Sequence, residues 1–107
     1  MEPERQKRPR PPLDEDALER MALFYVGRYA TTRAKLRTYL DRKLRERGWK
    51  GAERPPIDPI VERLSGLGYV DDNAFASARA ESLGRRGYGE RRIAQALSAA
   101  GIDEEDA

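Results

Sequence analysis

Four copies of one short pattern divide this chain into short segments. Each copy has a leucine, three further residues, a glycine and then an aromatic or aliphatic residue; the leucine–glycine pairs are Leu44 and Gly48, Leu64 and Gly68, Leu83 and Gly87, and Leu97 and Gly101. Helices often end on a residue in the left-handed conformation, which costs any residue other than glycine about 1–2 kcal/mol. The residue after such a glycine folds back toward its helix. The pattern therefore predicts short helices joined by tight turns, a scaffold that presents a surface and has no obvious catalytic pocket.

The composition excludes several classes of function. The 107 residues have room for one domain or a few small helical modules, and they include neither cysteine nor histidine. Disulfides and thiolate metal ligands are therefore excluded, and the most common general base near neutral pH is missing. No apolar run approaches the length of a membrane span or a signal-peptide core. We expect a cytoplasmic protein that is not an enzyme, with no metal, no cofactor, no membrane partner and no small-molecule substrate.

Apolar spacing and capping residues predict an all-α fold. The expected helices cover residues 14–30, 32–48, 58–68, 71–87 and 89–101, and residues 103–105 resemble the start of a sixth. Thr32 is the expected N-cap of the second helix. For the third we expect Asp58 as the cap and Pro59 at the first helical position, where proline is favoured. Leu67 is expected to be buried with the other apolar residues of that helix.

The chain contains an internal repeat. A shift of 57 residues places the first two helices on the fourth and fifth, so that Leu18 falls on Phe75 and Lys35 on Arg92. We therefore predict tandem three-helix units that resemble helix-turn-helix modules: a disordered arm rich in proline and arginine (1–12), a first repeat (13–68) and an incomplete second repeat (69–107). An incomplete repeat leaves an apolar edge, and we expect the chain to be a fragment or a naturally shortened form.

Charge is sorted by helix. Residues 31–54 carry nine Lys/Arg against three Asp/Glu, for a sum of +6, and residues 79–92 carry five against two, for +3. Residues 57–78 sum to −3 and residues 93–107 to −4. Equivalent helices of the two repeats are thus expected to expose cations, which suits a repeating anionic partner. The candidate contact residues are Lys35, Arg42, Arg45, Arg85, Arg86, Tyr88, Arg91 and Arg92.

Other polar and aromatic residues have structural explanations. Asp71 and Asp72 form a carboxylate pair that could suggest acid–base chemistry, but helix capping explains them better. Tyr69 and Tyr88 could stack on bases, but contacts at the helix ends with the preceding leucines explain them equally simply. No phosphate loop, metal cluster or nucleophile–base set is present.

Several segments together resemble the RecX-type regulatory proteins. The matching segments are residues 68–72 (GYVDD), 75–76 (FA), 85–89 (RRGYG), 91–93 (RRI) and 97, with 32–36 (TRAKL) in the first repeat. In that family, similar stretches bracket one helix of a repeat. The resemblance spans about residues 17–102, roughly one and two-thirds repeats. The second helix is about one turn longer than in the usual pattern, and residues 49–56 form an unusual connection.

The resemblance implies a non-enzymatic modulator. Family members consist of tandem three-helix repeats that lie along the groove of a RecA–DNA filament and restrain the recombinase in recombination and in the SOS response. Tyr88, Arg91 and Arg92 map onto the family's motif. Two alternatives stay open on the residues alone: an autonomous DNA-binding helical module, and a helical adaptor for an acidic protein.

Overall fold

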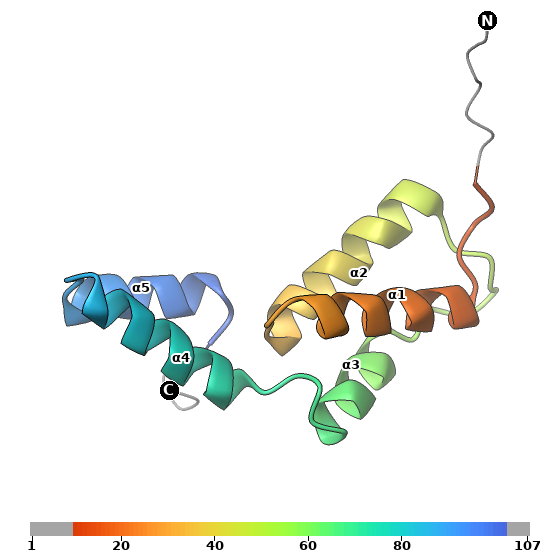
Figure 1. Cartoon of the computed structure of the whole chain (residues 1–107). Helices are drawn as coiled ribbons and strands as arrows, with labels where there is room; N and C mark the ends of the chain where they lie inside the picture. The colour runs from red at the N-terminus through yellow and green to blue at the C-terminus, as the bar shows by residue number, and fades with distance from the viewer. Residues whose placement is uncertain (1–9, 103–107) are drawn as a thin grey trace, which may run out of the picture.

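The computed structural model describes residues 10–102, and this part of the chain contains five α helices and no strand. They are α1 (Glu15–Arg28), α2 (Arg33–Arg47), α3 (Ile57–Gly66), α4 (Asp72–Arg85) and α5 (Glu90–Ala99). Figure 1 shows α1, α2 and α3 packed as one bundle, with α4 and α5 forming a hairpin beside it. The expected all-α fold is confirmed for these residues. Residues 1–9 of the expected arm and the expected start of a sixth helix lie outside the described residues.

The four glycines end helices as the sequence predicts. Each has a φ between 86° and 90°, and no other residue between 10 and 102 has a positive φ. After Gly68, Gly87 and Gly101, the next residue donates its backbone N–H to the carbonyl five positions earlier, at 2.9–3.1 Å. This bond closes the helix end and satisfies a carbonyl that would otherwise lack a partner.

The first copy of the pattern ends its helix differently. Trp49 leaves α2 to form an isolated β-bridge with Leu13, which is fully buried. Leu13 donates to the Gly48 carbonyl and accepts from the Lys50 N–H, each at 2.8 Å. The Arg47 guanidinium also donates to the Pro11 carbonyl at 3.2 Å. Pro11 therefore contacts the folded part, although the sequence places it in a disordered arm.

Two expectations for the third helix were wrong. Asp58 does not cap α3, which begins one residue earlier, at Ile57, with Pro56 at the N-cap and no side-chain capping bond. The carboxylate of Asp58 instead accepts from Arg37 of α2 at 2.8 Å. Leu67 is 66% exposed, because it is the residue after the last turn of α3 and its direction no longer follows the helical stripe.

The core is divided between the two units. Nine buried residues from α1, α2, α3 and the flanking segments form the larger cluster: Leu13, Leu18, Ala22, Leu36, Leu40, Ile60, Val61, Leu64 and Val70. The smaller cluster, between α4 and α5, contains only Ala76, Leu97 and Ile102 as buried members. Buried apolar area is the main favourable term in folding, so the α4–α5 hairpin depends on its contacts with the first bundle.

The N-terminus of α2 joins the two units. Thr32 caps α2 by accepting from the Lys35 N–H at 3.1 Å, and its hydroxyl donates to the Ala100 carbonyl at the end of α5, at 2.7 Å. Asp72, the first residue of α4, accepts from the Arg33 N–H at 2.9 Å. Two capping bonds of one helix thus reach residues of the other unit.

The repeat of 57 residues agrees with the helix bounds. Both ends of α4 lie 57 residues after those of α1, and the first residue of α5 lies 57 after that of α2. α5 is shorter than α2, ending at Ala99 against the full 15 residues of α2. The second copy therefore begins as the first does and departs from it after the first half of α5.

We predict that Gly101→Ala destabilises the protein more than Gly68→Ala does. Both glycines have a positive φ, so each substitution strains the backbone by about 1–2 kcal/mol. A Cβ at Gly68 meets no atom within 4 Å, whereas one at Gly101 overlaps the Ala34 methyl group of α2. Overpacking adds roughly 1–3 kcal/mol. Urea unfolding followed by circular dichroism measures both losses; equal losses would contradict the close contact between the C-terminal end of α5 and α2.

Candidate partner-binding surface

Part of the positive charge of α2 is neutralised within the fold. Arg37 binds Asp58 at 2.8 Å and Glu62 at 3.3 Å, and Arg33 binds Glu62 at 3.4 Å and Asp72 at 4.0 Å. Three of these four ion pairs join α2 to α3, and the fourth joins it to α4. Exposed pairs of this kind contribute about 0–1 kcal/mol each, so their main consequence here is that they remove two arginines from the charge offered to a partner.

The remaining cations of α2 lie on a different side of the helix. Lys35, Arg42 and Arg45 are exposed, and none of them forms an ion pair with any residue between 10 and 102. Lys35 and Arg42 line a groove of about 360 Å³ that α2 forms with the C-terminal end of α5, residues 98–101. The structure therefore brings these two predicted contact residues together, opposite the end of the second repeat.

Aromatic rings lie beside these cations. The rings of Tyr25 and Tyr39 stack with centroids 4.2 Å apart and an angle of 19° between their planes. The guanidinium carbon of Arg42 lies 5.5 Å from the Tyr39 ring centroid, within the range of a cation–π interaction. Both tyrosines line the same groove as Lys35 and Arg42. Burial raises the pKa of Tyr39 above 10, and the charge of Arg42 partly offsets this rise.

A second group of cations surrounds Tyr88, in the turn between α4 and α5. The guanidinium carbons of Arg86 and Arg92 lie 5.4 Å and 4.9 Å from the centroid of its ring. Arg91 is exposed on the first turn of α5. Arg85 differs from these residues, because it pairs with Glu81 one helical turn earlier, at 3.5 Å.

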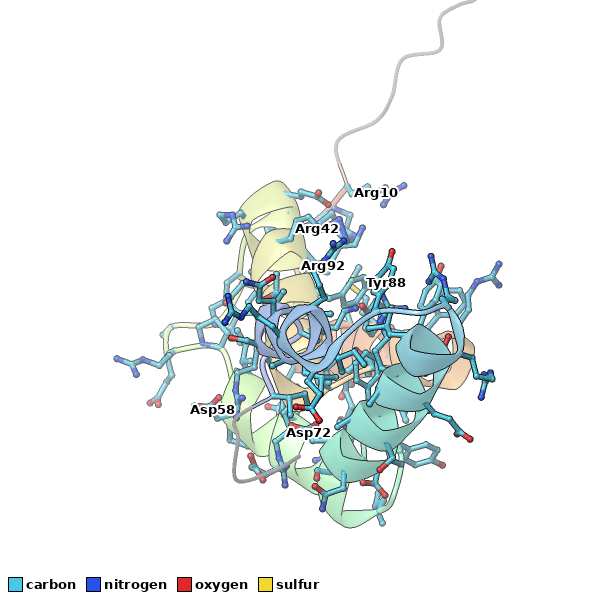
Figure 2. The ribbon with its side chains drawn as sticks, turned by 90° about the vertical axis from the view of Figure 1, so that its left-hand side faces the viewer. Arg10, Arg42, Asp58, Asp72, Tyr88 and Arg92 are labelled. Atoms are coloured by element: carbon cyan, nitrogen blue, oxygen red, sulfur yellow. The ribbon has the colours of Figure 1, made fainter. Side chains whose placement is uncertain are left out.

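Figure 2 shows how the two groups lie. The labelled side chains of Arg42, Tyr88 and Arg92 lie on the upper side in this view, and those of Asp58 and Asp72 lie on the lower side. Lys35 and Arg92 occupy equivalent positions of the repeat, but they contact different rings: Lys35 lies 5.4 Å from the centroid of Phe75 in α4. The structure thus separates cations from paired carboxylates without placing the two groups on one ring.

Two features of this surface were missed in the sequence. Arg28, at the end of α1, lies 5.9 Å from the ring centroids of both Phe24 and Tyr29. The repeat could have found it, since a shift of 57 places Arg28 on Arg85. Tyr39 had no comparable signal, because its stacking on Tyr25 depends on how α1 and α2 are rotated about their axes.

The acidic pair has structural partners. Asp71 accepts from the Ala74 N–H at 3.0 Å and so caps α4, while Asp72 is buried and accepts from Arg33 of the other unit. In residues 10–102, no group of three or more acidic, histidine or cysteine side chains could hold a metal ion. Between these same bounds, no helix has the length and apolar character needed to cross a lipid bilayer.

We predict that Arg42→Ala raises the pKa of Tyr39 further, because the cation that stabilises the phenolate is removed. Ultraviolet titration of the phenolate band measures this, with Tyr39→Phe to identify the signal and Arg45→Ala as a control. The same pKa rise implies a contribution to stability that is complete below pH 10 and is lost as the pH rises through the pKa of folded Tyr39. A Tyr39 signal at or below the ordinary value would contradict the burial of this ring.

Comparison with known proteins connects the chain with one family. The family model of the second three-helix domain of RecX matches residues 71–107. A regulatory protein RecX of Myxococcus xanthus is 36% identical over 104 residues, covering 92% of this chain and 55% of the relative. RecX of a Mycobacterium species (strain JLS) is 35% identical, covering 88% of this chain and 50% of the relative. RecX of Thermus thermophilus is 37% identical, covering 78% and 53%.

These matches cover both units of the structure and extend beyond the segment that the family model covers. No solved structure matches the chain significantly. The chain spans about half the length of the curated relatives it matches. Those relatives are named as regulatory proteins, and their similarity extends over most of this sequence. This chain therefore belongs to the RecX family of regulatory proteins.

Proposed function

We propose that the chain binds along a RecA–DNA filament and restrains the recombinase. The proposal assigns contact to a basic surface, which we define as Lys35, Arg42, Arg45, Arg86, Tyr88, Arg91 and Arg92. Its support is the family membership together with one observation: these six cations form no ion pair within residues 10–102, whereas Arg33 and Arg37 are neutralised inside the fold.

The physical basis of binding would be electrostatic. A filament of protein on DNA repeats its phosphates and its acidic side chains at regular intervals, so a partner with two separated cationic groups can engage successive repeats. Linking two weak contacts makes the second one intramolecular, which raises the overall affinity without any new contact. The groups around Arg42 and around Arg92 are two such contacts. Arg85 was among the candidates from the sequence, and its pairing with Glu81 makes it the weakest of them.

The rings contribute by fixing the cations. Tyr88 holds Arg86 and Arg92 near its ring, and Tyr39 does the same for Arg42. Each such contact contributes about 0.5–1 kcal/mol at an exposed site. A guanidinium that is already ordered loses less rotamer entropy when it binds an anion.

We predict that Arg91→Glu combined with Arg92→Glu weakens filament binding about tenfold or more and leaves helicity intact. Two exposed charge contacts contribute up to about 1 kcal/mol each, and reversal adds repulsion. Co-sedimentation with assembled filament measures the effect. Lys50→Glu combined with Arg54→Glu is the matched control, because both residues are exposed in the loop before α3 and the net charge changes equally. Equal weakening by both variants would show that net charge alone governs binding.

Direct binding to DNA is the second candidate, and the stacked tyrosines beside cations favour it, since aromatic rings next to basic side chains are common in single-strand binding sites. Co-sedimentation with DNA alone and with recombinase alone separates the two functions. Affinity for naked duplex that falls with salt, with a slope of about −0.9 per phosphate contacted, would support this candidate. Binding only to the recombinase without DNA would instead support an adaptor for an acidic protein surface.

A further inference from the structure

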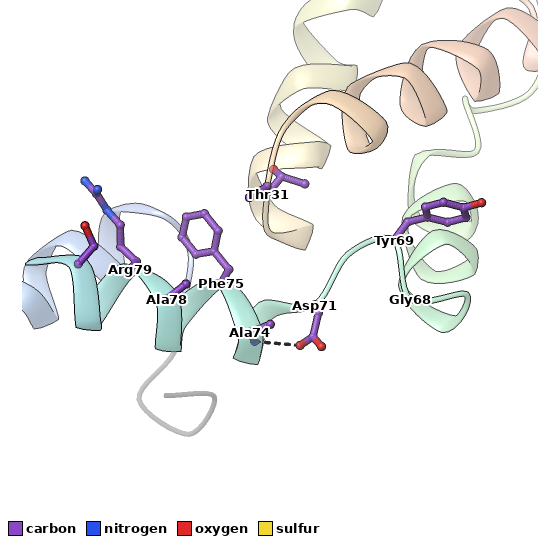
Figure 3. A pocket seen from close by; sticks show the side chains of 10 residues that line it. Thr31, Gly68, Tyr69, Asp71, Ala74, Phe75, Ala78 and Arg79 are labelled. Carbon is purple, nitrogen blue, oxygen red and sulfur yellow. Dashed lines mark hydrogen bonds between the residues drawn. The ribbon is translucent and has the colours of Figure 1, made fainter.

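An apolar groove of about 420 Å³ lies along α4, where it faces the first unit. Ala74, Phe75, Ala78 and Arg79 form its α4 wall, and Ala30 and Tyr69 belong to the opposite wall. Figure 3 shows Phe75 and Arg79 projecting from α4 toward the side on which Thr31 lies. The groove is separate from the basic surface, apart from Lys35, which reaches Phe75 from α2.

The repeat shows what such a face does elsewhere in the same chain. A shift of 57 places Phe75, Ala78 and Arg79 on Leu18, Met21 and Ala22 of α1. Leu18 and Ala22 are fully buried, and Met21 packs against the same cluster. α1 covers this face by packing against both α2 and α3. Within residues 10–102, α4 has the counterpart of α2, namely α5, but no counterpart of α3.

Arg79 gives the groove a charge preference. It replaces the buried Ala22 of the first unit, yet it is exposed and forms no ion pair with any residue between 10 and 102. An arginine next to Phe75 and alanine side chains keeps its alkyl stem on apolar surface and offers its guanidinium at the edge. A ligand that covers this wall leaves the guanidinium partly desolvated, so a carboxylate opposite it is strongly favoured.

The five residues after Ile102 in this sequence cannot form a helix of the length of α3, which has ten residues. We propose that the α4 groove binds an amphipathic helix of a separate polypeptide. The helix lies on α4 as the third helix lies on α1, with its apolar side on Phe75 and Ala78 and a glutamate or aspartate opposite Arg79. The proposal does not depend on the basic surface or on the filament.

The test uses the full chain and labelled peptides in a fluorescence anisotropy titration. The parent peptide has the sequence of residues 55–70, which contains α3, and three further peptides carry one glutamate in place of Ile60, Val61 or Leu64. We expect one glutamate peptide to bind the full chain more tightly than the parent peptide. With Arg79→Ala, whose groove then resembles that of α1, we expect this order to reverse, so that the parent binds at least about fivefold more tightly than the glutamate peptide.

Two control variants distinguish the groove from other sites. Ala78→Arg fills the groove from an exposed helix position and should abolish binding of every peptide while helicity is kept. Arg91→Glu combined with Arg92→Glu should leave peptide binding unchanged, so a failure of the proposed function and a failure of the groove are separable.

Three results would overturn the proposal. The first is that no peptide binds, or that Arg79→Ala changes the affinity of all peptides equally. The second is a dimer in sedimentation that Ala78→Arg abolishes, because the occupant would then be a second copy of this chain. The third is a gain in peptide affinity when the four carboxylates of residues 103–106 are replaced by amides, which would show that the chain's own end competes for the groove.

Discussion

The arrangement of the whole molecule depends on the first turn of α2. The first N–H groups of any helix lack partners within that helix, and its N-terminus carries a partial positive charge. Here one of these groups is bound by Thr32 and another by Asp72, a residue of the second unit. The Thr32 hydroxyl also binds the Ala100 carbonyl, at the negative end of α5. Because α4 and α5 bury few residues of their own, these bonds determine where the hairpin lies.

This joint also determines which charges remain available. Asp72 is used to bind Arg33, and Asp58 and Glu62 are used to bind Arg37, so the carboxylates nearest to α2 all lie on one side of it. The cations on the other side are left without an acidic partner in the described part of the chain, and the end of α5 brings a second wall to them. The basic surface is therefore a consequence of internal pairing as much as of the number of lysines and arginines.

Sequence reasoning identified the helices because their ends are encoded within a few residues. The positive φ of Gly68 and the capping bonds of Thr32 and Asp71 are local features, and the structure confirms them. The role of Asp58 was wrong because its partner, Arg37, is 21 residues away and the choice between capping and pairing depends on how α2 and α3 pack. The same limit applies to the candidate site: the sequence lists its cations, but which of them are neutralised depends on the neighbouring helix.

The two units are unequal in a way that links their surfaces. The face that α1 buries is open on α4, and Phe75, which lies on that face, carries Lys35 of the first unit above its ring. An ammonium group near an exposed ring is held by about 0.5–1 kcal/mol, and by more when the pair is desolvated. A helix lying in the α4 groove excludes water from Phe75 and therefore tightens its contact with Lys35. One residue of the basic surface is thus ordered by what occupies the groove, and the two surfaces are energetically coupled through a single pair of side chains.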